Sequence, residues 1–495
     1  MSSVRSLAKD TAIYGLSSII GRFLNWCLVP LYTIMFAADE YGVVTYIYSV
    51  VALALIILIY GMETGFFRFA NHDRWKDPME VYSTGLISLA VSSSVFLVGL
   101  LLCLQPASRV LQCAAHPEYV WMMGVAVALD AFTSLPFAYL RYRRRPMRFA
   151  VIKLTGIALN IGLNLFFILL CPWLMKVAPG VVDGFYSPTF GIGYIFLANL
   201  VSSAVTALML IPELCGFHWR FNRRLWREMM VYSMPLLVLG VAGIMNQTVD
   251  KLLLPYLVSD PAEAMTEVGI YGANYKIGIV MLMFIQAFRF AYEPFIFAQS
   301  RDKGEDRLEA YRQAMKWFVI FAMIIFMGVM FYLPVLKYFI SPRYFSGLKV
   351  VPVIMIAEFF FGVFFNLSLW YKLTDRTIWG TWYSLLGLAV TLAMNGLLVP
   401  VMGYMGCALA ALTCYGVMMV ASYLGGRRYY PIGYNVPRLA LYFFSALAMW
   451  GVSVLITTGK EWFDLPVRTV LLVIWIAAVM RHEKIKVRQL IPRRV

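Results

Sequence analysis

Fourteen long apolar stretches follow one another along the chain, separated by short polar connections. They run over residues 11–36, 42–69, 82–104, 119–140, 149–171, 190–212, 230–258, 268–298, 313–338, 350–371, 378–400, 404–425, 437–457 and 465–480. A helix that crosses a bilayer needs about 20 apolar residues. Only 14% of the 495 residues are charged, whereas a soluble domain carries about 25%. The sequence therefore predicts an all-α polytopic membrane protein and excludes a soluble or disordered chain.

Basic residues set the expected orientation of these helices. The net charge is +16, and most of the Lys and Arg lie in the termini and in the connections after even-numbered stretches. The densest cluster lies between the fourth and fifth stretches and contains Arg141, Arg143, Arg144, Arg145 and Arg148. Because cytoplasmic connections collect Lys and Arg, we expect both termini in the cytoplasm. The cluster would then meet anionic lipid or a cytoplasmic partner, and the charge requires no nucleic acid.

Signatures of metal binding and catalysis are missing from the sequence. The 7 cysteines are scattered and form no CxxC pair, and the 4 histidines lie in connections or in the tail. No Walker motif occurs. The longest connection expected outside, near residues 172–189, is too short for a catalytic domain. We therefore expect no metal, no cofactor and no enzymatic activity.

The two halves of the chain resemble each other at an offset of 227 residues. The matches are Glu40-Tyr-Gly42 with Glu267-Val-Gly269 and Tyr48 with Tyr275, with a weaker one of Asn164 and Gly191-Ile-Gly193 with Asn395 and Gly403-Tyr-Met-Gly406. Six stretches separate the copies, and an even number preserves orientation, so the repeat is parallel. It predicts two six-helix lobes, residues 1–222 and 223–430. Two further helices and a basic tail would occupy residues 431–495.

Charged residues inside the first and seventh stretches occupy nearly equivalent places in the two lobes. They are Arg22, Asp250 and Lys251. A charge within a membrane span is costly, so it usually faces a water-filled cavity or an opposite charge. We interpret the three residues as the wall of a charged cavity between the lobes. A structural ion pair such as Arg22–Asp250 is the alternative, and the two interpretations are compatible.

A second set of charges lies toward the expected cytoplasmic ends of the second and eighth stretches. It contains Glu63, Arg68, Arg289 and Glu293. Arg289 and Glu293 are four residues apart and share a helical face, so they can pair locally. These residues could form a charged ring at the inward mouth whose contacts change between two states. Simple extension of the side chains to the membrane surface would also explain them.

Two carboxylates and one lysine lie deeper in the expected spans. Asp130 is close to the midplane of the fourth stretch, and Glu358 lies in the tenth. Asp130, Glu358 and Asp250 are candidates for coupling to H+ or Na+, and a structural partner for each is the alternative. Lys276 is near the middle of the eighth stretch. Over all the expected spans, seven basic residues outnumber the candidate acids Glu63, Asp130, Asp250, Glu293 and Glu358, which favours an anionic ligand.

Several short motifs occur in order along the chain: Tyr14-Gly15, Gly21-Arg22, Pro30-Leu-Tyr32, Glu40-Tyr-Gly42, Gln247-Thr-Val-Asp-Lys251, Glu267-Val-Gly269-Ile-Tyr271, Asn395, Pro400, Gly403 and Gly406. Their order and spacing resemble the Wzx-type polysaccharide-biosynthesis flippases of the multidrug/oligosaccharidyl-lipid/polysaccharide exporter superfamily. The resemblance implies a two-lobe transporter that moves an undecaprenyl-diphosphate-linked oligosaccharide across a bacterial inner membrane by alternating access. The product would supply O-antigen lipopolysaccharide, capsule or exopolysaccharide synthesis, and polysaccharide-assembly proteins would be possible partners.

A diphosphate, a polar glycan and a long apolar tail suit a basic, wet cavity that opens sideways to lipid. The candidate diphosphate contacts are Arg22, Lys251, Lys276 and Arg289. A lipid II flippase handles a similar carrier and remains an alternative. A cation-coupled multidrug antiporter of the same fold would favour a more acidic cavity, and a polytopic polysaccharide polymerase would need a larger outward loop.

Overall fold

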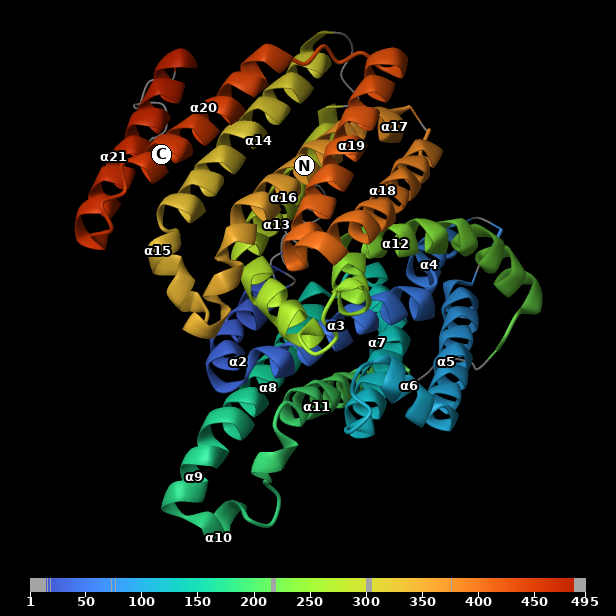
Figure 1. Ribbon diagram of the computed structural model, residues 1–495. Coiled ribbons are helices and arrows are strands. Elements are labelled where there is room, and N and C mark those ends of the chain that lie inside the picture. Colours follow the sequence, from blue (N-terminus) through green and yellow to red (C-terminus); the bar gives the residue numbers. More distant parts are fainter. Residues whose placement is uncertain are drawn as a thin grey trace, which may run out of the picture. The chain divides into compact units, whose positions relative to one another are not determined.

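A computed structural model describes residues 15, 17, 19–72, 74–75, 77–214, 220–299, 305–374 and 376–484, apart from the side chains of 291, 293–299 and 305–307. These residues contain helices and connections and no strand (Figure 1). Twelve helical segments are long and apolar enough to cross a membrane: Ala38–Ala70, Pro78–Leu102, Pro117–Tyr142, Pro146–Val177, Arg223–Leu257, Ala264–Phe290, Leu308–Phe331, Pro342–Leu373, Ile378–Met402, Tyr404–Tyr429, Val436–Leu455 and Glu461–His482. Two shorter apolar helices are Ile19–Met35 and Gly193–Met209. The prediction of an all-α polytopic membrane protein is confirmed.

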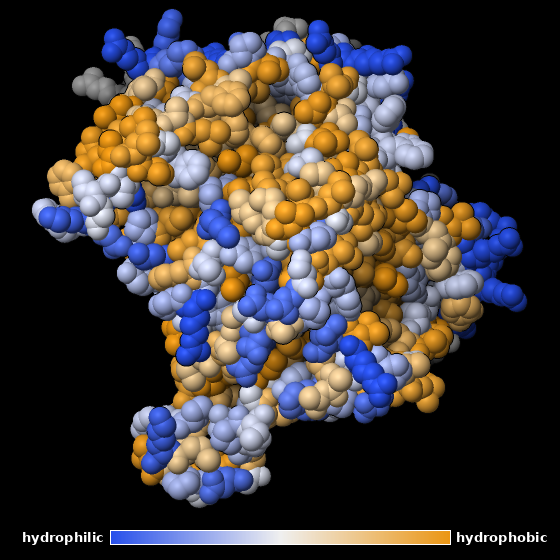
Figure 2. Space-filling view, viewed as in Figure 1, coloured by the Kyte–Doolittle hydropathy of each residue, from blue (hydrophilic) through white to orange (hydrophobic). Residues whose placement is uncertain are grey.

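The surface of the protein is that of a chain solvated by lipid. Apolar side chains cover broad areas of the face in Figure 2, and many large ones are exposed on the long helices, such as Val95, Leu397 and Val473. In water so much exposed apolar surface would drive aggregation, whereas in a bilayer it faces lipid tails. The backbone polar groups meanwhile bond within the helices, as a membrane interior demands.

The chain divides into two compact units. Unit 1 comprises residues 1–273 and 391–407, and unit 2 comprises residues 274–390 and 408–495. The lobe boundaries at 222 and 430 that the sequence predicts stay a prediction. Each unit is described below by itself.

Unit 1 contains most of the N-terminal helices. They are α2 (Val29–Met35), α3 (Ala38–Ile59), α4 (Met62–Ala70), α5 (Pro78–Leu102), α6 (Leu104–Val110), α7 (Pro117–Tyr142), α8 (Pro146–Leu165), α9 (Cys171–Val177), α10 (Pro179–Val182), α11 (Gly193–Met209), α12 (Arg223–Leu257) and the first part of α13 (Ala264–Gln299). Pro78, Pro117 and Pro146 each occupy the first turn of their helix, where a missing N–H costs nothing. Between α3 and α4 the second span breaks, because Tyr60 and Gly61 both adopt left-handed backbone conformations.

The two copies of the Glu-x-Gly motif meet in unit 1. A Cβ on Gly42 of α3 would collide with the backbone carbonyl of Met265, and one on Gly269 of α13 would collide with the carbonyl of Ala38. The two helices thus cross with their backbones in contact, and only glycine permits that approach. The acidic residue of each motif serves a nearby backbone: Glu40 accepts from the Ala37 N–H at 2.9 Å, and Glu267 accepts from the Tyr404 N–H at 2.8 Å.

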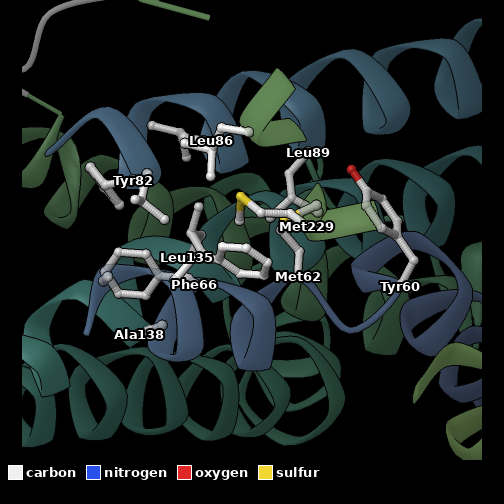
Figure 3. Packing of buried hydrophobic residues seen from close by; sticks show 13 residues of the cluster. Tyr60, Met62, Phe66, Tyr82, Leu86, Leu89, Leu135, Ala138 and Met229 are labelled. Atoms are coloured by element: carbon white, nitrogen blue, oxygen red, sulfur yellow. The ribbon is translucent and has the colours of Figure 1, made fainter. Parts of the chain in front are cut away.

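A hydrophobic cluster fixes α4 against α5, α7 and α12 (Figure 3). Phe66 of α4 is fully buried at its centre. Tyr82 of α5 stacks on Tyr139 of α7 with ring centroids 4.4 Å apart, and Met229 of α12 completes the cluster. The cluster holds the α4 residues Glu63 and Arg68 at one end of unit 1, which we call the basic end because Arg141–Arg148 lie there too.

Unit 2 contains the rest of α13 and most of the C-terminal helices. They are α14 (Glu305–Phe331), α15 (Leu333–Leu336), α16 (Val351–Leu367), α17 (Leu369–Leu373), α18 (Ile378–Met402) up to residue 390, α19 (Tyr404–Tyr429) from residue 408, α20 (Val436–Leu455) and α21 (Glu461–His482). A 3-10 segment, Pro342–Val350, precedes α16. Helix α14 packs against α16, α20 and α21. It thus connects the last two helices, α20 and α21, to the rest of unit 2.

Candidate functional site

The charges inside the seventh span belong to a buried cluster of polar side chains in unit 1. Asp250 and Lys251 of α12 are only 6% and 7% exposed, and the Lys251 Nζ lies 3.0 Å from the Asp250 carboxylate. The Tyr271 hydroxyl of α13 donates to the same carboxylate at 2.6 Å. Lys251 also donates to the Gln247 carbonyl at 3.2 Å, and its ammonium lies over the Tyr271 ring.

The Cys407 thiol of α19 belongs to the same cluster and donates to the backbone carbonyl of Asp250, 3.6 Å away. Helices α12, α13 and α19 are therefore tied together by groups of opposite charge and by hydrogen bonds. Asp250 forms its ion pair with Lys251, whereas the pair suggested from the sequence is Arg22–Asp250. This cluster can hold the three helices together. Its two charges are buried and pair with each other, so they are poorly placed to bind a ligand.

Asp130 has the opposite surroundings. It lies on α7 and is exposed, with the Ser203 hydroxyl of α11 and the Lys153 ammonium of α8 among its neighbours. An exposed carboxylate that faced lipid would be costly, so this side chain suits a water-filled space. Arg22 is likewise exposed. Both residues retain access to a ligand or an ion in a way that Asp250 does not.

Acidic residues at the basic end of unit 1 are engaged by arginines. Glu63 forms an ion pair with Arg141, and Arg68 stacks over the Tyr232 ring of α12 at 4.1 Å. Arg148 lies 2.9 Å from Glu213. Arg141 and Arg148 of the predicted cluster thus bind carboxylates from other parts of the fold.

The three remaining arginines of that cluster, Arg143, Arg144 and Arg145, are exposed. Arg144 adopts a left-handed conformation with φ of 52°, which ends α7 at a position where glycine is preferred. The exposed charges are therefore available to lipid or to a partner, as the sequence leads us to expect.

In unit 2, two cations flank one aromatic ring. The Arg289 guanidinium of α13 and the Lys372 ammonium of α17 each lie 4.5 Å from the centre of the Phe365 ring of α16. The two positive charges are thus held within about 9 Å of each other by a shared cation–π contact. Arg289 is exposed, so the pair has an open side.

Lys372 is absent from the residues that the sequence singles out, because it falls just beyond the tenth apolar stretch. One signal was available: Lys372 follows Phe365 by seven residues, which is two turns of a helix and places both on one face. Glu293, the other charge expected near Arg289, has a side chain outside the described residues.

The remaining predicted residues of unit 2 lie nearer the N-terminal ends of α13 and α16. Lys276 is half-buried. Glu358 is 2% exposed and accepts a hydrogen bond from the Tyr275 hydroxyl at 2.7 Å. Tyr275 is the repeat equivalent of Tyr48, whose hydroxyl instead contacts the Asn199 amide in unit 1. The hydrogen-bond partner of Glu358 therefore lies in the same unit.

Two cavities lie in unit 2 apart from these charged clusters. A small cavity of about 190 Å³ is lined by Trp370, Arg427 and Tyr430, among others. A larger one of about 490 Å³ lies between α14, α20 and α21. Over the described ranges, no group of three or more His, Cys, Asp or Glu side chains could hold a metal ion.

Comparison with known proteins identifies the family. The sequence model of a family described as polysaccharide biosynthesis protein matches residues 7–298, more than half of the chain. No curated protein matches the sequence.

Three of the solved structures that are similar in fold serve as examples. They are the lipid II flippase MurJ in an inward closed conformation (TM-score 0.72, 13% identity, 95% of this chain and 99% of that chain), a multidrug resistance MATE family transporter of the MOP superfamily in an inward-facing conformation (0.66, 14%, 88% and 98%) and the MATE multidrug transporter DinF-BH (0.61, 15%, 86% and 96%). At such identities the likeness shows the fold. The chain therefore belongs to the polysaccharide biosynthesis protein family and is a multi-pass membrane protein with a fold similar to that of these solved transporters.

Proposed function

We propose that the protein is a flippase for undecaprenyl-diphosphate-linked oligosaccharide repeat units. It takes them from the cytoplasmic to the periplasmic leaflet of a bacterial inner membrane, for O-antigen lipopolysaccharide, capsule or exopolysaccharide synthesis. Membership of the polysaccharide biosynthesis family and the fold shared with MurJ and MATE transporters support a flippase. The lipid-linked glycan and the bilayer are its partners, and polysaccharide-assembly proteins would act on the product.

The single observation that carries the proposal is the cation pair around Phe365. Arg289 and Lys372 concentrate two positive charges at one exposed place, each 4.5 Å from the ring. A diphosphate carries two adjacent negative groups that two cations beside one ring can contact together, and guanidinium groups bind phosphate oxygens in a bidentate manner. Lys276 and Arg22 remain candidates for further contacts, whereas the burial of Lys251 beside Asp250 favours a structural role for that lysine.

The proposed orientation follows from the same charges. Both termini lie in the cytoplasm, and the basic end of unit 1 faces the cytoplasmic leaflet, where anionic lipids attract Arg143, Arg144 and Arg145. The ion pair of Glu63 with Arg141 and the contact of Arg68 with Tyr232 then lie at the inward mouth. Contacts of that kind can form in one state of alternating access and break in the other.

Coupling, if transport is driven by H+ or Na+, is assigned to Asp130. Its carboxylate is exposed, and a carboxylate that ions can reach is able to exchange them. Asp250 and Glu358 are buried and already accept hydrogen bonds from Tyr271 and Tyr275. Ions reach these buried carboxylates less readily than Asp130, so they are weaker candidates.

The test is translocation of a labelled undecaprenyl-diphosphate oligosaccharide in proteoliposomes, with and without imposed proton and sodium gradients. Movement that requires the glycan and is lost in Arg289→Gln supports the proposal. Lipid II moved in preference to the oligosaccharide would favour the MurJ-like activity. Export of a cationic dye without any movement of lipid-linked glycan would favour the activity named for the MATE transporters.

A further inference from the structure

The larger cavity of unit 2 lies at the end where α21 begins. Its walls are mostly apolar and include Met330, Leu333, Trp450, Val454 and Leu465. It measures about 490 Å³, which is within the range of small-ligand sites. None of the proposed transport residues lines it.

Five charged side chains line the same cavity. Lys337, Lys349 and Arg468 are cationic, and Glu461 and Asp464 are carboxylates. Lys337 is neutralised by Glu461, whose carboxylate lies 3.0 Å from its Nζ. Asp464 accepts from the Thr458 and Gly459 N–H groups at 3.0 and 3.2 Å, which closes the turn before α21. The five residues leave one positive charge in excess.

Arg468 is the most unusual member of the group, because it is only 9% exposed and interacts electrostatically with Asp464, one helical turn before it, without a direct ion pair in the described part of the chain. Its Nη1 donates to the Phe331 carbonyl at the end of α14 at 3.2 Å, and its Nη2 donates to the Thr457 hydroxyl at 2.9 Å. Its Nε–H has no partner in the described part of the chain. A buried guanidinium with an unused donor is costly unless something anionic satisfies it.

The depth of the cavity relative to the membrane follows from exposed aromatic residues beside it. Tyr338, Trp462 and Phe463 are 62%, 75% and 49% exposed. Exposed Tyr and Trp gather at the level of the lipid headgroups. The charged end of the cavity is therefore level with lipid phosphates, while its apolar wall continues along α14 and α20 toward the lipid tails.

We propose that this cavity binds an anionic phospholipid of the outer leaflet, with the phosphate on Arg468 and Lys349 and an acyl chain along the apolar wall. One excess positive charge matches the single negative charge of a phosphodiester such as that of phosphatidylglycerol. A polyprenyl diphosphate carries more negative charge than the cavity balances. The bound lipid joins α14 to α20 and α21. The site goes beyond the proposed flippase activity and does not depend on it, whereas the choice of the outer leaflet rests on the orientation proposed above.

The experiment measures lipid binding to the full-length protein by native mass spectrometry, from detergent supplied with phosphatidylglycerol, phosphatidylcholine, inorganic phosphate or undecaprenyl diphosphate. We expect phosphatidylglycerol to bind more tightly than phosphatidylcholine. Arg468→Gln should weaken phosphatidylglycerol binding about tenfold, as for the loss of one charge-assisted hydrogen bond. Lys349→Gln should weaken it by a smaller factor, and because Lys349 is exposed, this variant keeps the fold if Arg468→Gln does not.

Lys460→Gln is the matched control, since Lys460 is exposed in the same turn but does not line the cavity. It should leave binding unchanged. Equal binding of the two phospholipids, or equal effects of Lys349→Gln and Lys460→Gln, would overturn the proposal. So would tighter binding of undecaprenyl diphosphate that the cavity variants abolish, or binding of inorganic phosphate with the same affinity as the lipid.

Discussion

Two clusters of charged residues, one in each unit, differ in their surroundings. The cluster in unit 1 is Asp250 with Lys251, and the cluster in unit 2 is Arg289 with Lys372. Asp250 and Lys251 are almost completely buried, and each charge has its counterpart 3.0 Å away. Arg289 and Lys372 carry charge of one sign, share the Phe365 ring, and keep an exposed side. The first cluster pairs opposite charges, and the second places two side chains of the same charge beside one ring. The difference separates a group that stabilises helix packing from one that can attract an anion.

The largest effect should come from breaking the buried pair. Lys251→Met leaves Asp250 without its counter-charge, and such a loss costs about 3–5 kcal/mol. The double variant Asp250→Asn, Lys251→Met should recover most of that stability, because no buried charge remains. Thermal unfolding in detergent measures both. A single variant as stable as the wild type, or a double variant that is no better than the single, would contradict the structural role.

The next effect tests the other half of the comparison. Arg289→Gln and Lys372→Gln should each lower flipping of a diphosphate-linked glycan at least tenfold, as expected when a charged hydrogen bond worth about 1.4 kcal/mol or more is removed. Unfolding should hardly change. Arg343→Gln, an exposed cation in the Pro342–Val350 segment, is the control. If both variants transport as well as the control does, the contacts of Arg289 and Lys372 with the Phe365 ring only stabilise packing and do not bind the substrate.

A smaller effect is expected for the exposed carboxylate of unit 1. Asp130→Asn should reduce the stimulation of transport by an ion gradient several-fold while leaving the gradient-free rate in place, because a neutral amide cannot exchange a proton and binds a cation more weakly than a carboxylate does. Ser203→Ala, which removes a neighbouring hydroxyl, should have a weaker effect in the same direction. If Asp130→Asn responds to the ion gradient as the wild type does, Asp130 is not the residue that couples transport to the ion.

The smallest effect concerns a carboxylate just beyond α21, where a paired acid can be titrated outside the spans. Burial of the Glu483 side chain opposes its ionisation, yet Lys316 at 2.6 Å, Tyr442 and Arg438 at 2.7 Å outweigh burial and lower its pKa. A lowered pKa stabilises the fold above the unfolded value of about 4.3, and that stability is lost as the pH falls through the folded value. Below about pH 4.3 the melting temperature of the wild type should fall toward that of Glu483→Gln, and parallel pH profiles would contradict this.

The spans were predictable because hydropathy is a local property. Each of the fourteen apolar stretches corresponds to one of the long or short apolar helices, and the glycine of each Glu-x-Gly motif lies at a helix crossing. Breaks inside a span were not predictable: Tyr60 and Gly61 interrupt the second one within a continuous apolar run.

The partners of charged residues could not be predicted, because they depend on contacts between distant segments. Glu63 pairs with Arg141, 78 residues away, rather than with a neighbour on α4. Arg468 lies in the last apolar stretch, where nothing in the local pattern indicates a buried guanidinium beside a cavity. Spacing can suggest which residues share a helix face, as for Phe365 and Lys372, but not which faces meet.

The crossing of Gly42 and Gly269 is reciprocal. Gly42 meets the carbonyl of Met265, and Gly269 meets the carbonyl of Ala38, so each contact is the other shifted by 227 residues. A contact with this property is isologous, as at the two-fold axis of a homodimer. Two copies of an ancestral half-length chain would have met here, and duplication with fusion of its gene would have preserved the contact. An association that once depended on protein concentration is then intramolecular and permanent.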